Sequence, residues 1–401
     1  MPFFLYLLGL AVFAQGTSEF MLSGLLPDLA ADLRVPLSAA GSLTSAFAVG
    51  MIVGAPLMAL LSRRWPRRRA LLAFLVTFLL VHVAGALTTS YPVLLATRVV
   101  AALANAGFLA VALATAASVV AADATGRATS VLLGGTTLAC VAGVPAGALL
   151  GAAWGWRSAF WAVAALAVPA VVAIVRSVPA DGGRAPGDAV RVRGELRTLR
   201  SPRLLLTLLL GALVNGATFC TFTYLAPLVT DVAGIGTGWV PAVLALFGLG
   251  AFAGVSAGGR LADTRPVPVL LTGGTALLAG WALLALTAGS PVAVLLLVPA
   301  LGALSFGVGS TLVAQALHAA TGAPTLAGGY ATAALNVGAA LGPWLGGAAL
   351  AAGFGHRAPV GVSVLLVALA LAVGGAALVG SRRLTPPRRD PGCVPVPSRR
   401  R

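Results

Sequence analysis

The sequence predicts an all-α membrane protein in which twelve spanning helices form two pseudo-symmetric halves of six helices each. Three observations support this fold class. The 401-residue chain is 59% hydrophobic and only 9% charged, whereas soluble domains carry about 25% charged residues. Apolar stretches of roughly 20 residues, enough to cross a bilayer, recur from residue 3 to near the end. Finally, residues of the first half reappear in the second.

We expect twelve spans, and because twelve is even, both termini face the same side of the membrane. The expected spans are 3–26, 38–61, 70–88, 92–121, 131–151, 158–175, 204–228, 239–258, 268–287, 291–317, 327–350 and 359–380.

The internal repeat has one fixed offset of 200 positions, about half the length of the chain. The pairs are Gly16/Gly216, Pro27/Pro227, Phe47/Phe247, Gly50/Gly250, Gly54/Gly254, Leu61/Leu261 and Arg157/Arg357. Two internal repeats in a protein with many spans are typical of a transporter whose binding site lies between its halves. We therefore expect an N-terminal half at 1–175 and a C-terminal half at 204–380, joined by a linker at 176–203. A basic tail at 381–401 has the composition of a disordered segment.

All 26 basic residues are arginine, and their positions indicate the orientation. Five follow the second span, one follows the fourth, seven follow the sixth, two follow the eighth and seven lie in the tail. These 22 lie on one side, which the positive-inside rule assigns to the cytoplasm. We therefore expect a bacterial plasma-membrane protein with both termini cytoplasmic. The net charge of +16 follows from this topology and is not a nucleic-acid-binding surface, which would need a soluble basic face.

Catalytic and metal-binding patterns are absent from the sequence. Cys140, Cys220 and Cys393 are too few and too scattered for a disulfide framework or a metal site. The three histidines are scattered as well, and no Ser/His/Asp or phosphate-loop pattern occurs. We therefore expect no enzyme, no metal and no cofactor.

Two charged residues lie inside predicted spans, where they are costly and usually functional. At 1.5 Å per residue, Glu19 in the first span and Arg98 in the fourth lie at similar depths, so the two could meet. A carboxyl that gains and loses a guanidinium neighbour can take up and release a proton, so the pair is a candidate for proton coupling. The alternative is a static ion pair that fixes two helices.

The seventh span carries aromatic and hydroxyl groups where the first carries Glu19. Such groups suit a largely apolar ligand with a few polar groups, although any one of them could instead bridge helices. The candidates for the substrate cavity are Gln15, Asn105, Asn215, Phe219, Phe222, Tyr224, Gln315 and Asn336.

Three motifs resemble those of the major facilitator superfamily. The loop after the eighth span, from Gly259 through Asp263 to Arg265, is similar to the cytoplasmic hairpin that holds that side of the transporter shut. The first-half copy departs from it, with Arg63 where an aspartate is expected, so there a topology-setting basic hairpin is equally plausible. Another of the three motifs is the arginine of span 4, within Leu94–Arg98.

The remaining motif combines glycine and proline within a span. Gly143, Pro145 and Gly147 in span 5 resemble the signature of antiporters in this superfamily, and Gly342 and Pro343 in span 11 give a fuller form. Proline removes a helical hydrogen bond while glycines allow close helix approach, so these segments are expected to hinge. A general small-residue packing face is the alternative.

Further segments resemble the twelve-span drug:proton antiporter branch, and within it the actinobacterial chloramphenicol resistance exporters. They are Thr17–Phe20, Gly24–Asp28, Ala31–Leu33, Gly143–Gly147 and Gly155–Arg157. The resemblance implies proton-driven efflux of a small neutral antibiotic, foremost chloramphenicol, by a protein that works as a monomer in the lipid bilayer. Export of a sugar or other metabolite, facilitated uptake, and a non-transporting scaffold or receptor are the alternatives.

Overall fold

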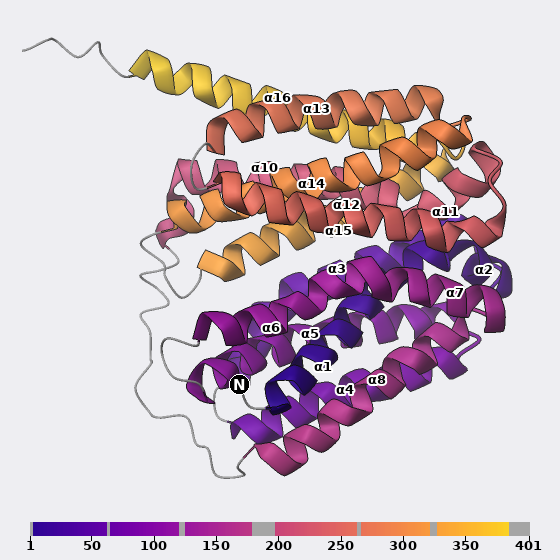
Figure 1. Cartoon of the computed structure of the whole chain (residues 1–401), viewed down its shortest axis with the longest axis vertical. Helices are drawn as coiled ribbons and strands as arrows, with labels where there is room; N and C mark the ends of the chain where they lie inside the picture. The colour runs from indigo at the N-terminus through magenta and orange to yellow at the C-terminus, as the bar shows by residue number, and fades with distance from the viewer. Residues whose placement is uncertain are drawn as a thin grey trace, which may run out of the picture.

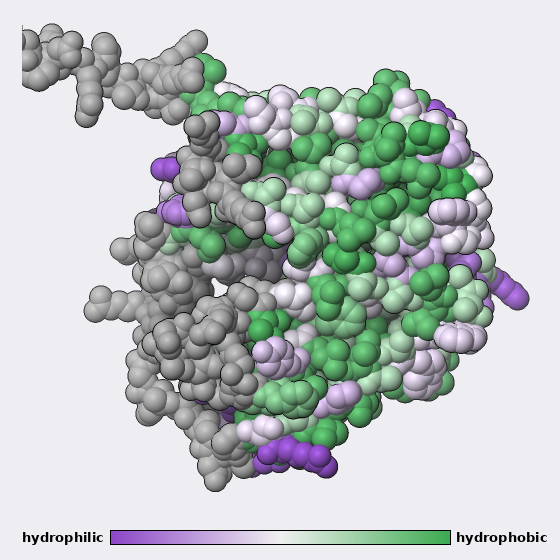
Figure 2. All heavy atoms as spheres, viewed as in Figure 1, coloured by the Kyte–Doolittle hydropathy of each residue, from purple (hydrophilic) through white to green (hydrophobic). Residues whose placement is uncertain are grey.

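The computed structural model describes residues 3–61, 65–119, 125–178, 197–262, 266–320 and 327–384. Twelve helices within these residues are long and apolar enough to cross a membrane, which confirms the predicted fold class. Large apolar side chains such as Leu286, Leu365 and Leu80 are more than half exposed, and Figure 2 shows hydrophobic residues across much of the outer face. An exposed apolar surface of this kind fits contact with lipid.

The helices of the first half are α1 (Phe3–Phe20), α2 (Leu26–Asp32), α3 (Leu37–Leu61), α4 (Arg67–Leu87), α5 (Tyr91–Val119), α6 (Thr125–Leu138), α7 (Val144–Trp154) and α8 (Arg157–Ser177). Those of the second half are α10 (Pro202–Thr223), α11 (Leu225–Pro227), α12 (Val240–Ala262), α13 (Pro266–Thr287), α14 (Pro291–Ala319), α15 (Ala327–Ala351) and α16 (Ala358–Leu384).

Every span lies within a few residues of its expected position. Of the expected linker, residues 179–196 lie outside the described part of the chain, and a 3-10 turn at Arg197–Arg200 precedes α10. Of the expected tail, residues 385–401 lie outside it, while 381–384 continue α16.

The first span of each half breaks at the same place. The expected spans over 3–26 and 204–228 are present, but within them α1 ends at Phe20 and α10 ends at Thr223. The proline pair of the repeat, Pro27 and Pro227, provides the reason. Proline clashes with the preceding helical turn and removes a backbone donor, so the chain passes through short turns and restarts as α2 and α11.

The fifth span is interrupted as well. A π-helical segment at Ala139–Gly143 separates α6 from α7, and Pro145 stands in the first turn of α7. Single-turn π segments within helices occur frequently at functional sites. Here the segment faces the other half, because Gly248 of α12 packs against the backbone of Cys140 and Val141.

Small residues set the closest helix pairs. In the second half, Gly338 and Gly342 of α15 face the backbone of Ala212 and Gly216 of α10, and a Cβ at either glycine would overlap that backbone. Small residues let membrane helices approach closely where no hydrophobic force draws them together. The glycine-rich part of span 11 is thus a packing face in this conformation.

The two halves meet at one end of the bundle. We call this the distal end; it carries Asp32, Arg157 and Asp231, whereas the terminal end carries Phe3 and Arg67. The ribbons of the halves lie together at the distal end and diverge toward the terminal end (Figure 1). The contacts between the halves run chiefly from α3 to α15 and from α12 to α7 and the π-helical segment.

An ion pair joins the end of α2 to the start of α8 at the distal end of the first half. Arg157 Nη1 donates to Asp32 Oδ2 at 2.6 Å, and the Trp156 indole donates to the same oxygen at 3.1 Å. These two bonds, that from Arg157 foremost, hold the pKa of Asp32 below its usual 3.8. Since Asp32 is half exposed, its contribution to stability is small.

Replacing Asp32 by Asn tests this pair. A carboxyl whose pKa is lower in the folded state stabilises that state above the unfolded pKa, and the stabilisation disappears as the pH falls through the folded pKa. We expect wild type to melt above Asp32→Asn at pH 6, and the difference to shrink as the pH falls below about 3.8 and to vanish below the lower pKa of the folded state. Thermal melts in detergent across this range are the measurement, and a difference that grows on acidification would contradict it.

Substituting Gly338 by Ala tests the packing of α15 on α10. The new methyl group would overlap the carbonyl oxygen of Ala212, so we expect a loss of about 1–3 kcal/mol of stability, as is common for overpacking. Gly375→Ala is the matched control, because no atom lies within 4 Å of a Cβ at Gly375 of α16. Thermal unfolding in detergent is the measurement, and equal melting of the two variants would contradict the prediction.

Candidate functional site

A buried guanidinium lies within the first half. Arg98 of α5 is 1% exposed, its Nη1 donates to Ser18 Oγ at 2.8 Å, and its Nη2 donates to the Ser18 carbonyl oxygen at 2.7 Å. The guanidinium carbon lies 4.5 Å from the centre of the Phe47 ring of α3, a cation–π contact. Three helices thus hold one buried charge.

Glu19 is adjacent to this group but is not bonded to it. The structure brings Arg98 to the turn of α1 that carries Glu19, as their expected depths require. The expected direct pairing is absent, because no Glu19 oxygen lies within the 4.0 Å limit of an ion pair in the described part of the chain. Neighbouring residues on a helix point about 100° apart, so a guanidinium seated on Ser18 does not face Glu19. In this conformation the Glu19 side chain is partly buried.

Further polar atoms of the first half are buried without partners. Gln15, one turn before Glu19, is 1% exposed, and neither atom of its amide forms a hydrogen bond within the described residues. The buried hydroxyls of Thr17, Thr44 and Ser45 likewise form no hydrogen bond within the described residues. Unpaired buried polar groups are expensive, and those in active and binding sites are available to a ligand.

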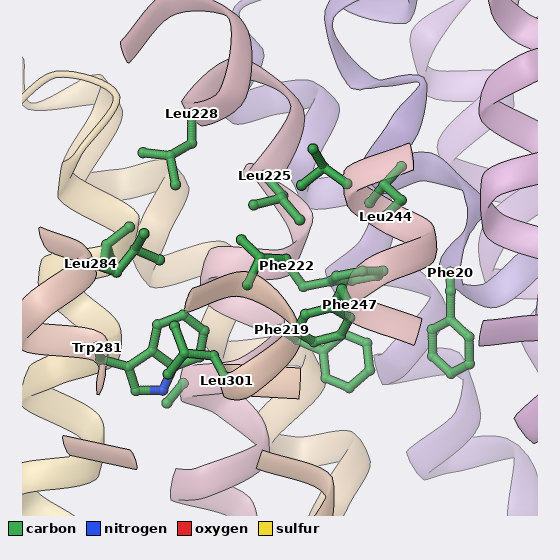
Figure 3. Close-up of a cluster of buried hydrophobic side chains, with 14 of the residues drawn as sticks. Phe20, Phe219, Phe222, Leu225, Leu228, Leu244, Phe247, Trp281, Leu284 and Leu301 are labelled. Atoms are coloured by element: carbon green, nitrogen blue, oxygen red, sulfur yellow. The ribbon is translucent and has the colours of Figure 1, made fainter. Parts of the chain in front are cut away.

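A row of aromatic rings leads from this polar group into the second half. Phe20 of the first half stacks on Phe219 with ring centres 5.5 Å apart, Phe219 meets the edge of Phe222 at 6.0 Å, and Phe222 stacks on Phe247 at 4.6 Å. Figure 3 shows these rings between Phe20 on one side and Trp281 on the other. We call Phe20, Phe219, Phe222 and Phe247 the aromatic row.

The aromatic row and the polar group meet at adjacent residues, since Phe20 follows Glu19. The rings of the aromatic row are buried against one another. The neighbouring turns of α1 carry a carboxyl and unpaired amide and hydroxyl groups. A pocket lined by Phe222, Phe247 and Trp281 lies beside the row, but it has room for about one water molecule.

The other expected cavity residues have mixed positions. Asn105 is buried in α5 and Gln315 is partly buried in α14. Asn215 Nδ2 donates to the Leu335 carbonyl and so bridges α10 to α15, whereas Asn336 Nδ2 donates to Thr332 of its own helix. Neither amide is directed at the aromatic row by these bonds.

Tyr224 lies at the distal seam rather than in a cavity. It is 1% exposed, and its hydroxyl donates to the Pro343 carbonyl of α15 at 3.0 Å. A Cβ at Gly41 of the first half or at Gly347 of the second would overlap this hydroxyl. The tyrosine therefore fills a space that glycines from both halves leave open, and it closes the seam.

The motif residues are placed as follows. Gly143 and Pro145 adjoin the break in span 5, where Gly143 packs on Thr17 of α1, and Gly147 packs on Met21. Gly259 is in the last turn of α12, while Asp263 and Arg265 lie outside the described residues. The gating role of these motifs stays a prediction.

Two residues of the polar group were missed in the sequence. Ser18 receives Arg98, and His82 of α4 contacts Ser18 with Nε2 2.6 Å from Oγ. Because the three histidines are scattered along the chain, the sequence indicated no role for His82. The available signal was an ionisable residue inside a span, which is a functional candidate by itself.

Comparison with known proteins agrees with the fold. The family model of the Major Facilitator Superfamily matches residues 8–327. The chain belongs to the major facilitator superfamily. It is therefore a transporter and not an enzyme, and a multi-pass protein of the bacterial plasma membrane.

Relatives of this transporter cover almost its whole length. The chain is 59% identical over 376 residues to a chloramphenicol resistance protein of Streptomyces lividans, covering 93% of this chain and 95% of the relative. It is 36% identical to the inner membrane transport protein YdhP of Escherichia coli (strain K12), covering 91% and 93%. A chloramphenicol efflux pump of Mycobacterium tuberculosis is 31% identical, covering 86% and 84%.

A solved structure shares the fold. The crystal structure of a D323A mutant of the nucleoside transporter NupG superposes with a TM-score of 0.73, covering 94% of this chain and 98% of that one, at 10% identity. At that identity the likeness concerns the fold alone.

Gly41→Val tests the seam. A valine side chain would occupy the position of the Tyr224 hydroxyl, so we expect the population to shift toward a state with an open distal end. A cysteine at Ser38, which packs near Gly347, should then react faster with a membrane-impermeant thiol reagent, measured without the native cysteines. Gly134→Val is the control because its site is open; equal labelling rates in both variants would contradict the seam.

Proposed function

We propose that this transporter exports chloramphenicol, a small neutral antibiotic, in exchange for protons and thereby confers resistance. The observation that carries the proposal is the 59% identity, over nearly the whole of both chains, to a protein named for chloramphenicol resistance. The geometry of the site supports it independently.

The site offers what this drug requires. Chloramphenicol combines a nitrophenyl ring with hydroxyl and amide groups and carries no net charge. The rings of the aromatic row are buried against one another in this conformation, and separation of Phe20 from Phe219 would give an aromatic ligand a ring face to stack on. The unpaired amide of Gln15 provides a donor and an acceptor near Glu19. A bound drug would lie between the halves, with its ring on Phe20 and Phe219.

Proton coupling is assigned to Glu19 and Arg98. A carboxyl apart from the guanidinium binds a proton readily, whereas a carboxyl beside it is stabilised in its charged form. In the present conformation Arg98 is bonded to Ser18, so Glu19 is open to protonation. Rocking of the halves would change the distance between the two charged groups and thereby tie proton movement to drug movement.

The proton gradient is a sufficient driving force without any cofactor. One proton crossing the membrane supplies about 2.3 kcal/mol per 100 mV, which corresponds to a drug gradient of about 50-fold. The arginine distribution supports a cytoplasmic position for both termini and for the divergent, terminal end. In this orientation the structure corresponds to an inward-facing state of a single chain in the bilayer.

The test is chloramphenicol accumulation in a susceptible host. We expect wild type to lower accumulation, and both a protonophore and Glu19→Gln to abolish the effect, because each removes the coupled proton. Asp231→Asn is the control, since it neutralises an exposed acid at the distal end.

Each other outcome has a distinct meaning. Low accumulation that survives Glu19→Gln would keep drug export and exclude Glu19 as the coupling residue. Unchanged accumulation with wild type would exclude chloramphenicol, and export of a sugar or another metabolite would then be the function to test.

A further inference from the structure

A buried hydrogen-bond chain extends from the guanidinium of Arg98 to the backbone of α4. Ser18 is its centre: the Ser18 hydroxyl receives Arg98 Nη1 at 2.8 Å and lies 2.6 Å from His82 Nε2. His82 Nδ1 in turn lies 2.7 Å from the Phe78 carbonyl oxygen. Ser18, His82 and Arg98 are each at most 1% exposed, so bulk water does not compete for these bonds.

The direction of the bonds follows from the two ends of the chain. The carbonyl of Phe78 only accepts, so His82 Nδ1 carries a hydrogen and the neutral ring presents Nε2 as an acceptor. Arg98 only donates, so the Ser18 oxygen accepts from the guanidinium. The Ser18 hydroxyl has one hydrogen, which it donates to His82 Nε2. The donors at Arg98 Nη1, Ser18 Oγ and His82 Nδ1 are then satisfied, and the orientation of the Ser18 hydroxyl is fixed by the histidine.

The surroundings of His82 contain one close charge. The rings of Phe78 on its own helix and Phe160 on α8 lie 4.1 and 5.8 Å from the imidazole centre. From α1 it meets Ser18, and the guanidinium of Arg98 on α5 follows behind that hydroxyl. Glu19 is the nearest acid in sequence to Ser18, and no carboxylate forms an ion pair with His82 among the described residues.

We propose that His82 is a positioning residue for proton coupling. Through Ser18 it holds the guanidinium of Arg98 outside ion-pair distance of Glu19, and so sets how strongly Arg98 stabilises the charged form of that carboxyl in this conformation. Without His82 the hydroxyl of Ser18 is free to rotate, and the guanidinium loses an oriented acceptor. Arg98 then shifts toward the carboxylate of Glu19, one residue farther along α1. This inference rests on the proposed proton-coupled export.

The experiment compares His82→Leu with His82→Gln in the purified transporter, reconstituted in vesicles. Chloramphenicol transport is measured against pH. His82→Leu removes the acceptor for Ser18, so Arg98 stabilises charged Glu19 and the midpoint of the profile moves about one unit toward acid. His82→Gln is the matched control, because its carboxamide oxygen accepts from Ser18 at about the reach of Nε2. Its midpoint stays at the wild-type value.

A second variant tests the route through Ser18. Ser18→Ala breaks the same chain, so it shifts the midpoint in the same direction as His82→Leu, and the double variant shifts it no further. Thermal melts accompany each variant. Should His82→Leu fail to fold, Ser18→Ala and His82→Gln carry the comparison, with a shift expected in the first and none in the second.

Several results would overturn the inference. They are an unchanged midpoint in Ser18→Ala or in folded His82→Leu, additive shifts in the double variant, and a shift in His82→Gln equal to that in His82→Leu. If these occur while wild type shows Glu19-dependent transport, the inference alone fails. Wild-type vesicles without pH-dependent chloramphenicol transport would overturn the proposed function and this inference together.

Discussion

The structure depends on close backbone contact between helices. Inside a bilayer the hydrophobic effect does not draw helices together, because lipid is as apolar as their side chains. Here glycine allows the approach instead: Gly338 and Gly342 seat α15 on α10, and Gly248 seats α12 on the π-helical segment of span 5. The first contact assembles one half, and the second joins the two halves. The aromatic row and the seam at Tyr224 both require these contacts.

The halves repeat one architecture but hold different chemistry. Both have a first span that breaks near a proline, at Pro27 and Pro227. The first half then carries a guanidinium, a carboxyl and unpaired polar groups, whereas at the position equivalent to Glu19 the second half has Phe219. In the proposed function this division separates proton coupling from ring recognition, yet Phe20 and Phe219 bring the two within one contact.

The sequence predicted the spans, the two halves and the depth of Arg98, because hydropathy and length determine how far a residue lies from a membrane face. It did not predict the partner of Arg98. Ser18 and Glu19 differ by 1.5 Å in height but by 100° in direction, and only the packing of α1 against α4 and α5 decides which of them faces the guanidinium. Glycine and proline in span 5 predicted a hinge at Gly143–Gly147, but the π turn at Ala139–Gly143 was hidden, since nothing in its apolar sequence distinguishes a π turn from an α turn.

The ion pairs at the distal end have a consequence for motion. Asp32 bonds to Arg157 within the first half, and Asp231 lies 3.0 Å from His356 within the second. Among the described residues, no ion pair therefore crosses from one half to the other. These two pairs hold neighbouring segments together within each half. Within the described part of the chain, the two halves are held together at the distal end by contact between uncharged surfaces. Salt screens charges but not dispersion forces, so the balance between the open and closed states of the distal end is set largely independently of the ionic strength of the solution at that end.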